Sequence, residues 1–194
     1  MAARWGPDGP PEEAYSRVTR DLAQVTAGFA AYLDELPGRL TAEFACRSRP
    51  LTDAERDRLT LVAGGPGEAG YAVEPADPGC ATLLVARSVH DGGTALTIGF
   101  GRAAVASMPS CFCDACDEES VGLIEQAQDY VDVVTGGSRE FRRRHRPRHP
   151  GEALHEGPWL EQGYLGERGG AASAGPDVRG PLFELDWRAW PLRS

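Results

Sequence analysis

Three of the five cysteines lie within six residues, in the segment SCFCDACDEE at positions 110–119. A thiolate is both a strong nucleophile and a soft metal ligand, so closely spaced cysteines predict either metal binding or thiol redox chemistry. The spacing C-x-C-x-x-C lets three sulfurs converge where a turn leads into a helix. This segment is therefore the first candidate for a functional site.

Acidic side chains surround these cysteines. Asp114 is predicted to be the N-cap of the helix that follows, with three more acids in its first turn at 117–119. A helix N-terminus lowers the pKa of a nearby thiol, whereas neighbouring carboxylates raise it. A bound divalent cation reconciles the two effects, because it deprotonates its thiol ligands and tolerates carboxylates. The pattern thus identifies Cys111, Cys113 and Cys116 as candidate metal ligands, with zinc as the candidate ion.

A structural zinc site normally has four protein ligands, and the sequence has no second C-x-x-C pair to complete one. Two alternatives stay open. Cys113 and Cys116 are spaced like a redox pair, and small buried cysteines often do no more than fill space in a core. The residues available as a fourth ligand, besides nearby carboxylates, are Cys46, Cys80, His90, His145, His149 and His155.

Composition excludes several classes of activity. All 20 cationic residues are arginine, so P-loop phosphate binding, kinase chemistry and Schiff-base catalysis have no lysine to use. The formal net charge of −9 argues against a nucleic-acid partner. No signal peptide and no apolar span of membrane length is present, which predicts a cytoplasmic protein without a membrane partner.

Hydrophobic periodicity predicts an α+β fold in a single domain over residues 1–194. A long N-terminal helix is expected over 10–39, ended by Pro37-Gly38, and a capping box at 52–55 opens a second, short helix. Strand-like segments follow, bounded by Pro-Gly and Gly-Gly pairs, and Asp91-Gly92-Gly93 is a hairpin signal. The expected strands are 71–75, 81–88, 94–100 and 102–108.

These strands predict an antiparallel sheet of three to five strands, with the cysteine-headed helix over 121–134 packed on it. The C-terminal third is expected to be partly irregular, with a solvated basic run over 139–148 and a flexible Gly/Ala-rich segment over 166–180. Residues 1–10 are expected to be disordered. The tryptophans near the C-terminus predict that the tail docks back onto the domain.

Three stretches resemble an actinobacterial protein family of unknown function. They are PEEAYSRVT (Pro11 to Thr19), CDACDE (Cys113 to Glu118) with its helix, and the tryptophan-rich C-terminus. The resemblance implies a bacterial cytoplasmic domain and carries no substrate, cofactor or catalytic residue. The expected function is a non-enzymatic domain whose cysteine cluster binds a structural metal or is simply packed. The alternatives are an acidic module that binds a basic protein partner and a cysteine-dependent redox enzyme.

Overall fold

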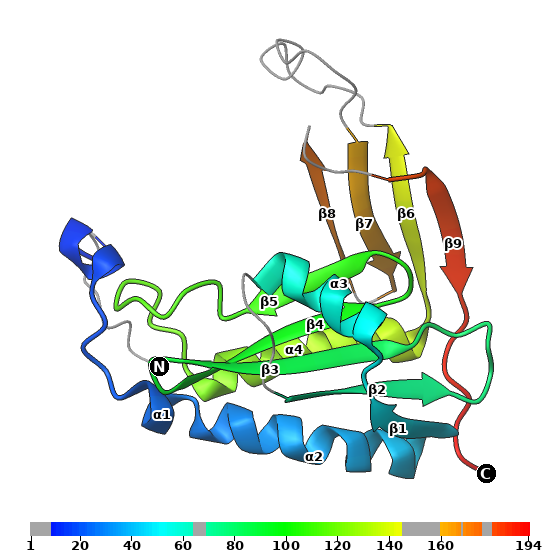
Figure 1. The fold of residues 1–194 in the computed structure, drawn as a ribbon, viewed down its shortest axis with the longest axis horizontal. Coiled ribbons are helices and arrows are strands. Elements are labelled where there is room, and N and C mark those ends of the chain that lie inside the picture. The colour runs from blue at the N-terminus through cyan, green and yellow to red at the C-terminus, as the bar shows by residue number, and fades with distance from the viewer. Residues whose placement is uncertain (1–8, 64–68, 145–159, 168, 176–179) are drawn as a thin grey trace.

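Two antiparallel sheets, the first covered by helices on both faces, make up the protein in a computed structural model (Figure 1). The structure describes residues 9–63, 69–144, 160–167, 169–175 and 180–194, so most of the expected disordered segment 1–10 lies outside it. The helical elements are η1 (Glu12–Ser16), α1 (Leu22–Val25), α2 (Ala27–Glu43), α3 (Asp53–Ala63) and α4 (Ser120–Gly136). Helices and strands pack together as one α+β domain, which confirms the predicted fold class.

The first sheet has five strands in sequence order, each antiparallel to the next. They are β1 (Cys46–Pro50), β2 (Ala69–Pro75), β3 (Leu83–His90), β4 (Gly93–Phe100) and β5 (Ala104–Met108). The turn between β3 and β4 has positive φ at Asp91 and Gly92, the conformation that tight hairpin turns require. The predicted hairpin is therefore confirmed, and the strand count agrees with the expected three to five.

Helices cover both faces of this sheet (Figure 1). The main core lies between the sheet and the pair α2 and α4, where Phe29, Leu123 and Phe100 are fully buried. On the opposite face α3 contributes Leu59 to a smaller core. The start of α3 has the predicted capping box, because the Glu55 N–H donates to Thr52 Oγ1 and the Thr52 N–H donates to the Glu55 carboxylate.

The N-terminal helix differs from its prediction. Instead of one helix over 10–39, the chain forms η1, an extended connection, α1 and α2, and α2 continues through Pro37 to Glu43. Leu36 and Leu40, on either side of Pro37, are both buried in the main core. Their packing outweighs the local tendency of Pro-Gly to end a helix.

The described part of the C-terminal third is more regular than the sequence predicted. It forms a second sheet in the order β8-β7-β6-β9, all antiparallel (Figure 1). The strands are β6 (Ser138–Arg144), β7 (Leu160–Gly166), β8 (Gly169–Gly175) and β9 (Phe183–Trp187). Strand β8 lies inside the Gly/Ala-rich segment 166–180, of which residues 168 and 176–179 lie outside the described residues; the mobility of this segment stays a prediction.

A buried carboxylate joins the two sheets. Glu140 in β6 is 0% exposed and accepts hydrogen bonds from the backbone N–H groups of Arg102, Ala103 and Ala104, in the turn between β4 and β5. The Trp187 indole N–H of β9 donates to the same carboxylate at 3.0 Å. Four donors thus replace the water that a buried negative charge would otherwise need.

The C-terminal tail returns to the first sheet, as predicted. Trp190 is buried, and its indole N–H donates to the Ala81 carbonyl at 3.0 Å. The Ala45 N–H donates to the Pro191 carbonyl at 2.8 Å, beside β1. Within the described part of the chain, no helix has the length and apolar character needed to cross a bilayer.

Candidate metal centre

The connection between β5 and α4 brings the three clustered cysteines together. Their Sγ atoms are 3.1 Å apart for Cys111 and Cys113, 2.7 Å for Cys111 and Cys116, and 3.5 Å for Cys113 and Cys116. All three sulfurs lie within 4.8 Å of one another, an arrangement that could hold a metal ion. Each sulfur contacts both of the others instead of entering a separate apolar pocket.

Contacts within the loop favour a thiolate at Cys113. The pKa of Cys113 is lowered, first by a hydrogen bond from the Cys111 thiol and then by the backbone N–H groups of Cys116 and Ala115. The pKa of Cys116 is raised to about 12, mainly because its thiol is hydrogen-bonded to Cys111 and is partly desolvated. The loop therefore favours a negative charge at its most buried sulfur, as a ligating cysteine requires.

The role predicted for Asp114 was wrong. Helix α4 begins at Ser120 with Glu119 as its N-cap, so the cysteines precede the helix instead of opening it. Asp114 is buried, and its carboxylate accepts hydrogen bonds from the Thr19 N–H at 3.0 Å and the Thr19 hydroxyl at 2.7 Å. This side chain fastens the loop to a segment 95 residues earlier in the sequence.

The N-terminal segment clamps the cysteine loop through its backbone as well. The Asp114 N–H donates to the Arg17 carbonyl at 2.8 Å, and the Ala115 N–H donates to the Ala14 carbonyl at 3.1 Å. Just after the loop, the Ser120 hydroxyl donates to the Val25 carbonyl at 2.6 Å. The stretches 11–19 and 113–118 are thus hydrogen-bonded to each other. No pattern in the sequence predicted this contact.

Arg20 reduces the acidity around the sulfurs. Its guanidinium lies 3.1 Å from the Asp117 carboxylate and 3.9 Å from that of Asp114, and only 14% of its side chain is exposed. No pattern in the sequence identified Arg20 as part of the site. One arginine thus offsets much of the negative charge of the two aspartates nearest the cysteines.

The expected fourth ligands lie elsewhere or outside the described residues. Within the described chain, no further cysteine, histidine or acidic group joins the cluster. His90 Nε2 lies 3.1 Å from the Ser88 hydroxyl in the β3–β4 hairpin. The positions of His145, His149 and His155 fall in the segment 145–159, which the structure does not describe.

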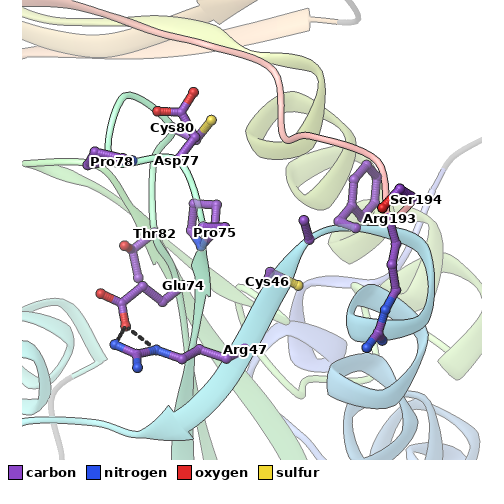
Figure 2. A pocket seen from close by; sticks show the side chains of 13 residues that line it. Cys46, Arg47, Glu74, Pro75, Asp77, Pro78, Cys80, Thr82, Arg193 and Ser194 are labelled. Atoms are coloured by element: carbon purple, nitrogen blue, oxygen red, sulfur yellow. Dashed lines mark hydrogen bonds and ion pairs between the residues drawn. The ribbon is translucent and has the colours of Figure 1, made fainter.

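The other two cysteines line a separate cavity of about 770 Å³ between the β1–β2 edge and the C-terminal tail (Figure 2). The Cys46 thiol donates to the Leu40 carbonyl at 3.4 Å, and the Cys80 thiol donates to the Ala189 carbonyl at 3.2 Å. Burial raises the pKa of both thiols. Both thiols are thus hydrogen-bonded to backbone carbonyls and lie apart from the three-cysteine cluster, so neither supplies its fourth ligand.

Two ion pairs lie at this cavity, and Arg193, which also lines it, donates a hydrogen bond to the Thr41 carbonyl. Figure 2 shows Arg47 bound to Glu74, with the guanidinium 2.9 Å from the carboxylate. Asp77 is paired with Arg188 at 2.5 Å. Arg47, Glu74 and Asp77 at this cavity are therefore held in ion pairs.

The described part of the basic run pairs with acids on adjacent strands. In β6, Arg139 lies 2.8 Å from Asp186 of β9, and Arg143 lies 3.0 Å from Glu161 of β7. Cross-strand pairs of opposite charge stabilise a sheet. Arg139 and Arg143 are exposed as predicted, but this part of the run is a strand and not a loop. The rest of it, 145–148, lies outside the described residues.

The chain belongs to a family of unknown function, DUF6226, whose model matches residues 2–194. No curated protein and no solved structure matches it. The predicted membership of an uncharacterised family is therefore confirmed.

Proposed function

We propose that Cys111, Cys113 and Cys116 bind one zinc ion, which holds the β5–α4 loop and the N-terminal segment together. The observation that carries the proposal is the mutual contact of three sulfurs at 2.7–3.5 Å. Tetrahedral Zn–S bonds of about 2.3 Å place sulfurs about 3.8 Å apart, so an ion would move each pair of sulfurs apart by about 1 Å or less.

The burial of the cysteines supports metal binding over simple packing. Cysteines that only fill space are buried among hydrocarbon groups. Here Cys113 is buried, Cys111 is half-buried and Cys116 is exposed, so burial alone does not explain why all three sulfurs converge. Sulfur ligands select soft or borderline ions, which favours zinc over magnesium or calcium.

A bound ion would add stability where the chain has little regular structure. Residues 109–119 contain turns but no helix or strand, and the N-terminal segment contacts them through a few hydrogen bonds. Cross-linking three positions of this loop would fix the backbone and carboxylate groups that Ala14, Arg17 and Thr19 contact. Binding energy at such a site is also folding energy.

The test is elemental analysis of protein purified without added metal. We expect about one zinc per chain, lost in the double variant Cys113→Ser/Cys116→Ser and retained in the matched controls Cys46→Ser and Cys80→Ser. A metal-free wild type that is as stable with added zinc as without it would refute the proposal.

The 2.7 Å separation of the Cys111 and Cys116 sulfurs supports a second candidate, a reversible disulfide between them. The two thiols would give two electrons and two protons to a small-molecule disulfide, which is reduced to two thiols. Treatment of chelated protein with glutathione disulfide, followed by mass spectrometry, tests this candidate. Loss of two hydrogens in wild type but not in Cys116→Ser would support it, and an unchanged mass would exclude it.

A further inference from the structure

The three-cysteine cluster is open on one side. Cys113 is 8% exposed, whereas Cys116 belongs to the exposed surface of the loop. An ion held by these sulfurs would be covered on the Cys113 side and would face solvent on the Cys116 side. Zinc sites with four protein ligands enclose the ion, whereas sites with three keep one position for water or another small ligand.

The nearest acids are engaged in other contacts. Asp114 binds Thr19 with both carboxylate oxygens, and Asp117 is held by Arg20. In the described part of the chain, no other cysteine, histidine or acidic group lies within 4.8 Å of all three sulfurs. Among the described residues, a fourth ligand from either aspartate would require one of these contacts to break.

Charge determines which ligand the open position favours. A divalent ion with three thiolates carries one net negative charge, and Glu118 and Glu119 lie in the same loop, directly after Asp117. Arg20 offsets much of the negative charge on Asp114 and Asp117 but not the charge on these two glutamates. An anion is therefore repelled from the fourth position, whereas a neutral donor is not.

We infer that the zinc site keeps an exchangeable fourth coordination position, which accepts a neutral nitrogen donor such as an imidazole in preference to an anion. The inference rests on the proposed zinc site and adds the class of ligand that the site takes. A histidine side chain of a partner or of a peptide is a donor of this class.

The test uses wild-type protein loaded with Co²⁺, whose visible absorption reports its ligands. Binding at the cysteines gives a thiolate-to-cobalt charge-transfer band, which is absent in Cys113→Ser/Cys116→Ser and present in Cys46→Ser. The loaded protein is then titrated with imidazole and, separately, with azide. We expect imidazole to shift the visible bands, with a half-maximal concentration roughly tenfold below that of azide.

The outcomes separate the two proposals. Absence of the charge-transfer band in wild type would refute the metal site itself. If the charge-transfer band is present but neither ligand changes the visible bands, the proposed metal site stands. The proposed open coordination position is then overturned. Azide binding as strongly as imidazole would overturn the charge preference. Glu119→Gln removes one exposed negative charge near the site. This variant is expected to bring the half-maximal concentrations of imidazole and azide closer together.

Discussion

The Tyr71 hydroxyl donates a hydrogen bond to the Leu33 carbonyl at 3.0 Å, joining β2 to the middle of α2. In a regular helix this carbonyl would accept the N–H of residue 37, but residue 37 is proline and has none. Tyr71 therefore supplies the donor that Pro37 lacks. This contact, together with the buried Leu36 and Leu40, explains why α2 continues where the sequence predicted its end.

Replacing Tyr71 by Phe should lower stability by about 1–3 kcal/mol, because the Leu33 carbonyl then loses its donor in a half-buried site. Urea unfolding measures the change. The same substitution in a Pro37→Ala background should have a smaller effect, since alanine at that position brings back a helical N–H. Equal effects in both backgrounds would show that the tyrosine does not compensate for the proline.

Burial of the same tyrosine predicts instability at alkaline pH. Desolvation raises the pKa of Tyr71 above its ordinary value of 10.0, and burial acts in the same direction on the pKa values of Tyr32 and Tyr164. Above pH 10 the unfolded chain loses these protons while the folded chain keeps them, so stability should fall as pH rises. The chain has no lysine to titrate in this range.

Thermal melts from pH 9 to 11 would test this dependence, with Tyr71→Phe as the comparison. Half-buried Cys46 and buried Cys80, whose pKa values are also raised by desolvation, contribute to the same decline from about pH 9 upward. The variant should lose stability less steeply above pH 10 than wild type. If melting temperature fell equally steeply with pH in both proteins, the loss of stability above pH 10 would not come from Tyr71.

Glu140→Gln should destabilise the junction of the two sheets by about 3 kcal/mol or more. The carboxylate accepts four N–H groups with no exposure, and a glutamine NH₂ would face donors with another donor. Chemical denaturation checks the magnitude. The matched control is Glu184→Gln, an exposed acid in β9 whose loss should change stability by less than about 0.5 kcal/mol. A similar result for both would contradict a special role for Glu140.

The sequence predicted the features that depend on residues close together in the chain. The apolar periodicity of α4, the Asp91-Gly92-Gly93 turn between β3 and β4, and the Thr52–Glu55 capping box all lie within one element or one hairpin. The C-x-C-x-x-C spacing likewise identified three sulfurs that do converge. In each case the residues that determine the structure are neighbours in the sequence.

The features that the sequence did not reveal depend on distant residues. Strand β8 has the sequence GGAASAG, with no β-branched residue, and β6 is rich in arginine; their cross-strand partners determine that they are strands. Asp114 was predicted to be a helix N-cap because that prediction used only its neighbours in the sequence. Its partner, Thr19, comes from the N-terminal part of the chain.

The clamp between Asp114 and Thr19 should also control the cysteine cluster. Asp114→Asn replaces one acceptor oxygen by an NH₂ group, which cannot accept from the Thr19 N–H or hydroxyl and weakens the ion pair with Arg20. The loop would then hold its sulfurs less rigidly, and zinc affinity should fall about tenfold, as for other residues that support metal ligands.

Competition with a chromophoric chelator measures that affinity, and Glu119→Gln serves as the control because it removes an equal charge from an exposed side chain. We expect Thr19→Val, which removes only the hydroxyl, to fall between Asp114→Asn and wild type. If Asp114→Asn and Glu119→Gln changed affinity equally, the effect would come from net charge and not from the clamp. A graded series would instead tie metal affinity to the contact between the N-terminal segment and the cysteine loop, because only that contact weakens stepwise from wild type through Thr19→Val to Asp114→Asn.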